Sequence, residues 1–481
     1  MEKVRTRFAP SPTGFMHLGG LRTALYSYLY AKQHGGDFIL RIEDTDQERY
    51  VEGAIDVIYS SLKESGLTYD EGPDVGGNYG PYVQSERKSI YMEYAKKLIE
   101  LGGAYYCFCS KERLESLTDE NGNRKYDKHC LHLSKEEVEA RLKAGEPFVI
   151  RQNIPAEGKS SYDDLVYGTI TVDYSELEDN ILIKSDGMPT YNFANVVDDH
   201  LMKISHVVRG TEYLSSTPKY NLMYDAFGWE RPKYIHLPTI MKDATRKLSK
   251  RYGDANFDDF VNKGYLPQAI INYVALLGWS PKENIEKMSM EQMIELFSLD
   301  GVSKSPAIFD DAKLRWLNGE YLKEMTDEEF LKVAEPFFKK SKVYGKYDLL
   351  QLSALMKPRV EILSEIPDKI NFLEEFGDYD VQLFYHKKMK TDAELAKKVL
   401  PVIRDRIASV TDFTHDNVHD SLMALAAESG LKNGQVLWPA RVALSGKDVT
   451  PGGAIELCCI LGKDESIRRI NYSIELLNKN A

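Results

Sequence analysis

Residues 7–20, with the sequence RFAPSPTGFMHLGG, decide the fold class of this 481-residue chain. Residues 4–10 form a predicted strand, and the two glycines that close the stretch open a predicted helix. The apolar residues of that helix recur from Leu21 at i, i+3, i+4, i+7 and i+8, a spacing that buries one face against a sheet. A strand that leads through a turn into a helix is the first half of a βαβ unit.

The next elements extend this unit into a doubly wound α/β fold. Residues 37–44, DFILRIED, form a second predicted strand with an apolar centre, which is typical of a buried parallel strand. Residues 54–63 form a further predicted helix. Ligands bind such sheets at the carboxyl ends of the strands, so we expect residues 7–11 and 41–46 to lie at one edge.

His17, Gly19 and Gly20 stand where the chain enters the first predicted helix. Glycine lets backbone N–H groups approach a phosphate there, and the helix dipole favours the negative charge. The imidazole can donate a hydrogen bond to an oxygen that gains charge in a transition state. Taken alone, the same residues could be a surface histidine before an ordinary helix.

A second phosphate-handling pattern, KLSKR at residues 247–251, begins 230 positions after His17 (247 − 17). Lys247 and Lys250 are flexible point charges suited to a moving triphosphate. A solvated basic loop is the alternative interpretation. Two such patterns in this order, each after a predicted strand, favour an enzyme that transfers an adenylate group from ATP.

Four stretches of the chain carry a family resemblance. RFAPSPTGFMHLGG, RIEDTD, PTYNFANVVDDHL and KLSKR resemble motifs of the bacterial-type glutamyl-tRNA synthetases, which are class I aminoacyl-tRNA synthetases. HLGG and KLSKR correspond to the family's HIGH and KMSKS signatures and depart from them in detail, yet they keep His17, Lys247 and Lys250. The resemblance implies a glutamate–tRNA ligase. Glutamate would attack the α-phosphate of ATP, and the glutamyl-adenylate would pass its acyl group to the 3′-terminal adenosine of tRNA-Glu.

The resemblance also implies a domain order. We expect an α/β fold with a Rossmann-like class I catalytic domain that holds an α+β insertion, followed by an all-helical C-terminal anticodon-binding region. The sequence pattern changes to short strands and charged turns near residue 104, and to helical periodicity after residue 326. The expected segments are the first catalytic half at 1–104, an acceptor-stem-binding insertion at 105–179, the second catalytic half at 180–255, a stem-contact region at 256–325 and the helical region at 326–481.

The resemblance implies how the phosphates of ATP are held. His17, Lys247 and Lys250 would stabilise the charge that develops on the phosphate, and Mg²⁺ is expected to accompany ATP. Glu212 would contact the adenosine side. The predicted ATP-binding residues are Pro10, Ser11, Thr13, Gly14, His17, Gly19, Gly20, Glu212, Lys247, Ser249 and Lys250.

The resemblance likewise implies a glutamate pocket. Arg7 and Arg209 would bind carboxylate groups through their planar forks, and Glu43 would face the ammonium group. For Tyr191 and Asn195 the alternative is a packing and capping role. The predicted glutamate-binding residues are Arg7, Ser11, Glu43, Tyr191, Asn195 and Arg209.

Three cysteines and a histidine in the expected insertion predict a structural zinc site. Cys107 and Cys109 are followed, after 20 intervening residues (130 − 109 − 1), by Cys130 and His132. Cys₃His is an established structural zinc set, and four protein ligands leave no open position. Some glutamyl-tRNA synthetases carry zinc at this place. His129 is an alternative fourth ligand, and reduced structural thiols without a metal are the alternative to zinc.

Composition excludes some classes of partner and location. The net charge of −12 argues against indiscriminate nucleic-acid binding, although a local basic face can act on an acidic body. No apolar run of about 18 residues predicts a membrane span, and the N-terminus resembles no secretory signal. Five cysteines in a chain of this length fit a reducing cytoplasm. Cys458 and Cys459 read as core residues, and a monomer is the family expectation.

Three rival functions are disfavoured. A small-molecule nucleotidylyltransferase, or the shortened tRNA-modifying relative of the family, does not need the 230 residues that follow the lysine loop (481 − 251). A non-enzymatic RNA-binding paralogue should have lost the phosphate-handling residues. The sequence does not reveal whether tRNA-Gln is also charged, and we expect a form that charges only tRNA-Glu. Arg359 is a candidate base-reading residue, with a solvated helix-surface arginine as the alternative.

Overall fold

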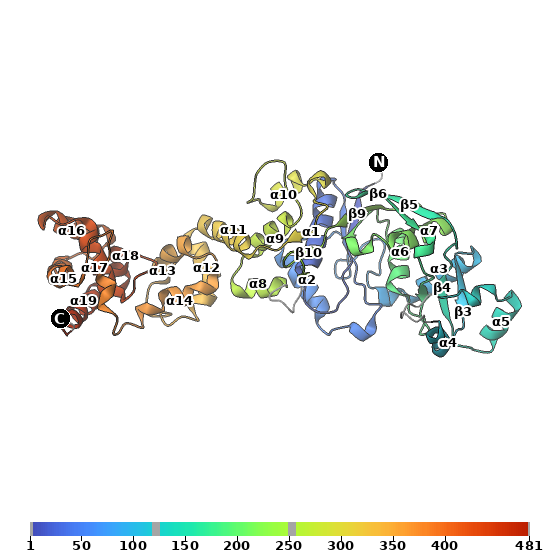
Figure 1. Ribbon diagram of the computed structural model, residues 1–481, viewed down its shortest axis with the longest axis horizontal. Helices are drawn as coiled ribbons and strands as arrows, with labels where there is room; N and C mark the ends of the chain where they lie inside the picture. The colour runs from blue at the N-terminus through green and yellow to red at the C-terminus, as the bar shows by residue number, and fades with distance from the viewer. Residues whose placement is uncertain (1–2, 118–125, 249–255, 480–481) are drawn as a thin grey trace. The chain divides into compact units, whose positions relative to one another are not determined.

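The computed structural model describes residues 3–117, 126–248 and 256–479. The chain divides into two compact units (Figure 1). Unit 1 comprises Met1–Asn262 and Pro267–Asp311, and unit 2 comprises Lys263–Leu266 and Ala312–Ala481. None of the helices in the described ranges is both long and apolar enough to cross a membrane.

Four residues that interrupt unit 1 in the sequence therefore pack within unit 2. The backbone N–H of Leu266 donates to Asn318 Oδ1 at 2.8 Å, and the backbone N–H of Leu363 donates to the carbonyl of Gly264 at 3.3 Å. Tyr265 and Leu266 are each only 4% exposed. This four-residue segment is an integral part of the core of unit 2.

Unit 1 begins with the predicted βαβ arrangement. β1 (Arg5–Phe8) pairs in parallel with β2 (Asp37–Leu40), and α1 (Leu18–Gln33) connects them. β8 (His206–Gly210) pairs in parallel with β9 (Lys233–Leu237). β8 lies beside β1, because the backbone N–H of Ser205 donates to the Arg5 carbonyl at 3.0 Å. The prediction of a parallel, doubly wound arrangement is confirmed, although both early strands end sooner than the sequence pattern suggests.

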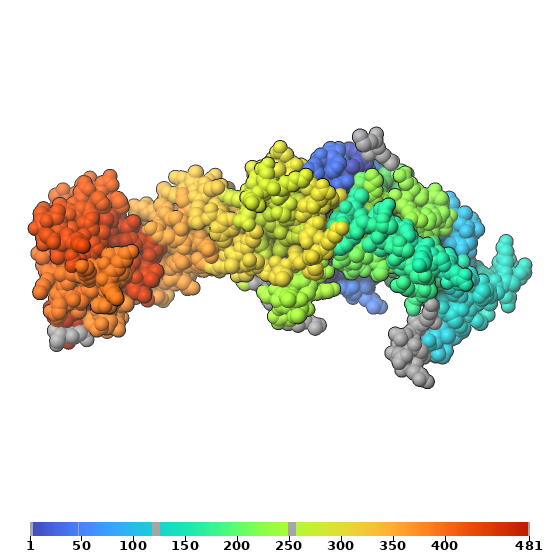
Figure 2. Space-filling model, turned by 45° about the horizontal axis from the view of Figure 1, so that its top comes forward, coloured from blue at the N-terminus to red at the C-terminus, as the bar shows by residue number. Residues whose placement is uncertain are grey.

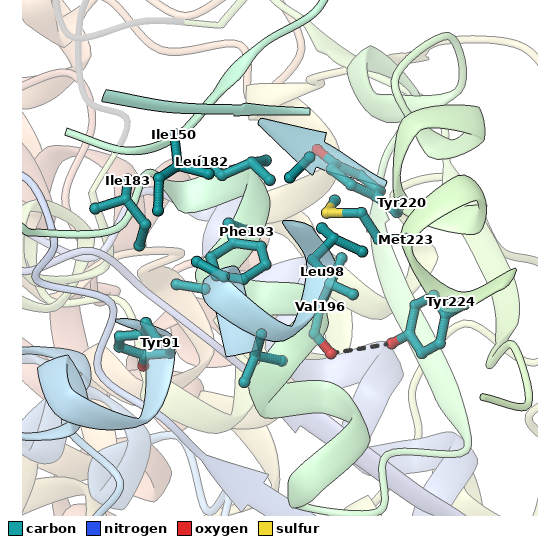
Figure 3. Close-up of a cluster of buried hydrophobic side chains, with 14 residues drawn as sticks. Tyr91, Leu98, Ile150, Leu182, Ile183, Phe193, Val196, Tyr220, Met223 and Tyr224 are labelled. Atoms are coloured by element: carbon teal, nitrogen blue, oxygen red, sulfur yellow. Dashed lines mark hydrogen bonds between the residues drawn. The ribbon is translucent and has the colours of Figure 1, made fainter. Parts of the chain in front are cut away.

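Helices cover this parallel arrangement and share one large apolar cluster (Figure 3). Phe193 and Leu182 are fully buried in it, and the hydroxyl of Tyr224 donates to the carbonyl of Val196 at 3.5 Å. Its buried side chains come from three strands and three helices, so the cluster joins the inserted sheet to the catalytic helices. Besides α1 and two helices of the inserted region, the α-helices before β9 are α2 (Ala54–Glu64), α3 (Lys88–Glu100), α6 (Tyr191–Leu201) and α7 (Thr217–Phe227).

Strands of the region expected as an insertion pair with strands that lie outside it. β3 (Ala104–Cys107), β4 (Val149–Gln152) and β7 (Ile181–Ile183) form an antiparallel sheet. β5 (Lys159–Asp164) and β6 (Gly168–Asp173) form a hairpin that pairs with β9, which gives the order β6-β5-β9-β8. The hairpin therefore continues the catalytic sheet.

Two helices of this region, α4 (Lys111–Ser116) and α5 (Lys135–Lys143), contain no buried residue. α5 lies at the surface of the molecule, in the cyan part of the space-filling view (Figure 2). A helix that buries no side chain depends on its caps. In α5 the Ser134 hydroxyl accepts from the backbone N–H of Glu137, whose carboxylate accepts from the backbone N–H of Ser134.

The last part of unit 1 adds a short parallel pair and helices. β10 (Ile240–Met241) pairs with β11 (Ala307–Ile308). The helices are α8 (Phe257–Lys263), α9 (Pro267–Leu276) and α10 (Met290–Leu296).

Unit 2 contains helices and no strand in its described part, as the periodicity after residue 326 predicts. The Thr326 hydroxyl and the Glu329 carboxylate form a capping box at the start of one of them. Cys458 is fully buried, as predicted, and Cys459 is half-buried. The helices are α11 (Asp311–Glu324), α12 (Asp327–Phe338), α13 (Leu349–Met356), α14 (Ile366–Ile370), α15 (Ala393–Ser409), α16 (His415–Glu428), α17 (Asn433–Ser445), α18 (Ala454–Leu461) and α19 (Lys463–Lys479).

Candidate active site

A cleft of about 460 Å³ opens where the parallel strands of unit 1 end. This volume lies in the usual range for a small-molecule site. The backbone N–H of Glu43 donates to the Pro10 carbonyl at 3.0 Å, so the segments that leave β1 and β2 stay side by side. The predicted site residues that line the cleft are Arg7, Pro10, Ser11, Gly14, His17, Gly20, Glu43, Tyr191, Arg209 and Glu212.

His17 is the N-cap of α1. Its Nδ1 accepts a hydrogen bond from the backbone N–H of Gly19 at 3.0 Å. Because Nδ1 is an acceptor, the neutral ring carries its proton on Nε2. A Cβ on Gly19 would lie 3.3 Å from Nδ1, so glycine keeps this contact unstrained. The imidazole can therefore donate from Nε2 into the cleft.

The first turn of α1, which the structure describes in full, carries no acidic side chain. The partial positive charge of the helix start is therefore not neutralised by its own residues. Together with the His17 donor, this end of the cleft favours a negatively charged group such as a phosphate.

Arg7 and Glu43, which line the cleft, belong to a buried cluster of two arginines and two carboxylates. Arg7 donates from Nε and Nη2 to the two oxygens of Asp199 at 3.0 and 3.3 Å. Arg41 donates from Nη1 to Asp199 Oδ1 at 2.7 Å and from Nη2 to Glu43 Oε1 at 2.8 Å. The four side chains are at most 5% exposed. Asp199 thus fixes Arg7 directly, and fixes Glu43 through Arg41.

Burial and ion pairing together lower the pKa of one carboxylate of this cluster and raise the pKa of the other. Burial alone would raise the pKa of Asp199, but the charges and hydrogen bonds of Arg7 and Arg41 outweigh it and lower that pKa. Burial also raises the pKa of Glu43, and here Arg41 opposes the shift without cancelling it. A ligand ammonium group beside Glu43 would favour its charged form.

Arg209 lies on β8 and is 5% exposed. Its charge centre lies 4.8 Å from the ring centroid of Tyr220 and 5.2 Å from that of Tyr213. Tyr191, the first residue of α6, packs against Tyr213 with 5.6 Å between ring centroids. Within α6, the amide of Asn195 donates to the carbonyl of Tyr191, four positions earlier, at 2.8 Å.

Some predicted residues lie away from the cleft walls. Thr13, Gly19, Asn195 and Lys247 are not among the side chains that line it. Lys247 is exposed and pairs through its backbone with Met241, so Lys247 follows β10 in a hairpin-like turn. Ser249, Lys250 and Arg251 lie outside the described residues.

The structure brings the three predicted metal-binding cysteines together. The Sγ atoms of Cys107, Cys109 and Cys130 lie within 4.8 Å of one another. The backbone N–H of Phe108 donates to Cys130 Sγ at 3.4 Å, and Arg151 Nε donates to Cys107 Sγ at 3.4 Å. Donors aimed at sulfur stabilise thiolates, and thiolates bind zinc. This arrangement fits a structural metal site.

Beside the three cysteines lies a tyrosine that the sequence reasoning did not single out. The hydroxyl of Tyr126 lies 3.3 Å from Cys107 Sγ and 3.4 Å from Cys109 Sγ. It also accepts from the backbone N–H of Cys130 at 3.2 Å. His129 and His132 are exposed and do not belong to the cluster of close ligand atoms.

Comparison with known proteins gives the family. Residues 3–316 match the class I tRNA synthetases (E and Q), catalytic domain, and residues 329–474 match an anticodon binding domain. The chain belongs to the class I tRNA synthetases of the glutamate and glutamine group. The predicted family, and the order of a class I catalytic domain before an anticodon-binding region, are confirmed.

Individual glutamate–tRNA ligases match this chain over its full length. A glutamate–tRNA ligase of Clostridium botulinum (strain Eklund 17B / Type B) is 59% identical, and the match covers 99% of both chains. One from Lachnoclostridium phytofermentans is 56% identical over 100% of both. The crystal structure of a glutamate tRNA ligase from Elizabethkingia meningosepticum in complex with its amino acid has a TM-score of 0.89 at 38% identity. That match covers 98% of this chain and 99% of the other.

Three residues of the candidate site escaped the sequence reasoning. Asp199 stands in the quoted stretch PTYNFANVVDDHL and Arg41 begins RIEDTD, but neither pattern says that their side chains meet. Tyr126 is a lone tyrosine four positions before Cys130. The only available signal was its position near the cysteines.

Proposed function

We propose that this protein is a glutamate–tRNA ligase that activates L-glutamate with ATP and transfers it to the 3′-terminal adenosine of tRNA-Glu. The observation that carries the proposal is the full-length match to glutamate–tRNA ligases at 59% identity. The cleft adds chemical support, since it combines two buried arginines with a phosphate-favouring helix start.

The proposed first step is an in-line attack. A carboxylate oxygen of glutamate forms a bond to the α-phosphorus of ATP while the bond to the pyrophosphate leaving group breaks. His17 would donate from Nε2 to a phosphate oxygen that gains charge, and Lys247 and Lys250 would meet the same charge from the lysine loop. Mg²⁺ bound to ATP would neutralise phosphate charge.

Glutamate would bind at the ion cluster. Arg7 and Arg209 would each bind a carboxylate, and Glu43 would accept from the ammonium group. Tyr191 and Ser11 would close the pocket, and Asn195 would hold Tyr191 in place. The ATP side would use Pro10, Ser11, Thr13, Gly14, Gly19, Gly20, Glu212 and Ser249.

Unit 2 would read the anticodon, since residues 329–474 match an anticodon binding domain. Arg359 is exposed and donates to the Leu355 carbonyl at 2.7 Å, which would leave other donors for a base edge. We propose that it contributes to the choice of tRNA-Glu over tRNA-Gln. The five-segment organisation given above, a monomeric state and a cytoplasmic location belong to the same proposal.

The cysteine cluster would hold one structural zinc ion. Cys107, Cys109 and Cys130 would supply thiolates, with His132 as the predicted fourth ligand and Tyr126 as the nearer candidate. Zinc would stiffen the region between β3 and β4, which the proposal assigns to the acceptor stem.

Charging assays test the proposal directly. The protein should attach glutamate to tRNA-Glu in an ATP-dependent reaction, and glutamate-dependent pyrophosphate exchange should require tRNA. Arg209→Gln should raise the KM for glutamate about 10²–10³-fold, because a buried carboxylate loses its partner. Arg231→Gln changes a partly exposed arginine paired with Asp225 and should leave the KM for glutamate unchanged. Absence of glutamylation with tRNA-Glu would refute the function; equal charging of tRNA-Gln would refute only the predicted selectivity.

A further inference from the structure

His236 lies on β9 behind the cleft and is fully buried. Its Nδ1 lies 2.7 Å from Asp164 Oδ2, and its Nε2 lies 3.2 Å from Arg209 Nε. An arginine Nε carries a proton and can only donate. His236 Nε2 must therefore accept, and the ring proton must sit on Nδ1, where it is donated to Asp164.

Asp164 is held so that it can impose this tautomer. Its Oδ1 accepts from the backbone N–H groups of Val166 and Tyr167 at 2.9 and 2.8 Å. Its Oδ2 accepts from the backbone N–H of His236 at 3.1 Å as well as from the ring. Neither Asp164 nor His236 has an exposed side chain. Because Oδ2 accepts from the ring, this held carboxylate selects the Nδ1–H form of His236.

The same arrangement restricts the guanidinium of Arg209. Nη2 of Arg209 donates to Thr217 Oγ1 at 2.6 Å, and that hydroxyl donates to the Tyr213 carbonyl at 2.8 Å. Arginine has five N–H donors, and these contacts use one on Nε and one on Nη2. The remaining donors are the two on Nη1 and one on Nη2. These donors form an edge of the Arg209 guanidinium that can donate but not accept hydrogen bonds, and Arg209 lines the cleft.

We propose that Asp164 and His236 are positioning residues that fix the Arg209 guanidinium, through the tautomer of His236, for a carboxylate of the amino-acid substrate. This inference rests on the proposed function, because it takes glutamate as that substrate. A free arginine side chain samples many rotamers. A guanidinium group that is already fixed before the substrate binds loses less conformational entropy on binding. A donor-only edge also disfavours a carboxamide, whose NH₂ group would face other donors.

Asp164→Asn tests the tautomer directly. The asparagine Oδ1 can keep the bonds from Val166 and Tyr167, which places its NH₂ group against His236 Nδ1. That ring would then carry its proton on Nε2, facing the Nε–H of Arg209. We expect the KM for glutamate to rise about 10- to 100-fold, the usual effect of one lost charge-assisted hydrogen bond. The KM for ATP should change less than about twofold.

His236→Leu and His236→Gln separate positioning from packing. Leucine removes the acceptor and should raise the KM for glutamate as Asp164→Asn does. Glutamine offers an amide oxygen near the place of Nε2 and should recover most of the loss. His206→Leu is the matched control, because His206 is another buried histidine, on β8, whose Nδ1 contacts Ser205 and not Arg209. It should leave both KM values unchanged.

The measurements are tRNA charging at varied glutamate and at varied ATP, and ¹⁵N NMR of histidine-labelled wild-type protein to read the ring tautomer of His236. The Nδ1–H form is the expected result. An Nε2–H ring, equal rises of both KM values, or no recovery by His236→Gln would each overturn the inference. The tautomer is read without catalysis, so it stands apart from the proposed function. If the wild-type protein failed to glutamylate tRNA, only the proposed function would fall.

Discussion

Asp199→Asn probes the link between the two arginines of the cleft. Asp199 accepts from Arg7 at 3.0 and 3.3 Å and from Arg41 at 2.7 Å. Asparagine keeps one acceptor but removes a negative charge and turns an NH₂ group toward one of the arginines. With the asparagine oxygen in the place of Oδ1, Arg41 keeps its bonds to residue 199 and to Glu43, and Arg7 keeps the bond from Nε, but Nη2 of Arg7 then faces the NH₂ group. The loss therefore falls mainly on Arg7.

The magnitude follows from the burial of this cluster. Breaking a buried ion pair by removing one partner costs about 3–5 kcal/mol. We expect the lower end, about 3 kcal/mol, because the asparagine oxygen still accepts from Arg41. Arg7 also loses the bond from Nη2, one of the two bonds that fix its guanidinium on this side chain. Losing one charge-assisted contact of about 1.5–3 kcal/mol raises the KM for glutamate about 10- to 100-fold.

Differential scanning calorimetry and charging assays measure the two effects on the full chain. The transition that belongs to unit 1 should move down by about 5 °C or more. Asp225→Asn is the matched control, because Asp225 pairs with Arg231 at the surface, with side chains 46% and 35% exposed. An exposed pair contributes about 0–1 kcal/mol. Equal melting temperatures and equal glutamate KM values for Asp199→Asn and Asp225→Asn would refute the reasoning.

Three further predictions concern separate parts of the chain. His17→Asn keeps an acceptor for the helix cap but loses the Nε2 donor, so adenylate formation measured by rapid quench should slow about 10²–10³-fold with an unchanged melting temperature; an unimpaired rate would remove His17 from the phosphate site. Cys107→Ser should lower bound zinc from about one ion per chain to nearly none by metal analysis, whereas Cys459→Ser should not, and a zinc-free wild type would end the metal assignment. The hydrogen bond from Arg468 lowers the pKa of Glu465 to about 2, against the opposing effect of burial. A depressed pKa gives stability that is present above about pH 4.3 and is lost as the pH falls toward 2, so the stability gap between wild type and Glu465→Gln should shrink on acidification from pH 6 to pH 3. A gap that stayed constant over that range would contradict this assignment.

Local sequence patterns were sufficient to predict much of the fold and the start of α1, where we expect the phosphates of ATP to bind. Periodicity located α1 and α2 and marked the region after residue 326 as helical, because a helix depends on residues three or four positions apart. The same holds for His17, whose cap bond reaches only to Gly19. Contacts between distant positions were beyond this reasoning. The bond from Arg7 to Asp199 spans 192 positions, and that from His236 to Asp164 spans 72.

In the insertion, too, the features set by neighbouring residues could be predicted and those set by distant residues could not. The cysteine spacing predicted the cluster, because Cys107 and Cys109 are nearly adjacent in sequence and Cys130 completes a known type of set. The pairing of Asp164 with Tyr234, which joins the inserted hairpin to the catalytic sheet, has no local signature. Tyr126 likewise enters the thiol cluster through packing, since Arg151 lies 4.4 Å above its ring.

The segment Lys263–Leu266, which belongs to unit 2 although unit 1 flanks it, has a practical consequence for fragment design. The chain passes from one unit to the other three times, after Asn262, Leu266 and Asp311, so a single cut does not release either unit whole. A catalytic fragment that ends at Asp311 would carry Tyr265 and Leu266 without the neighbours that leave them only 4% exposed. Two newly uncovered apolar side chains favour aggregation. Replacing both with polar residues should therefore be part of any attempt to produce unit 1 alone.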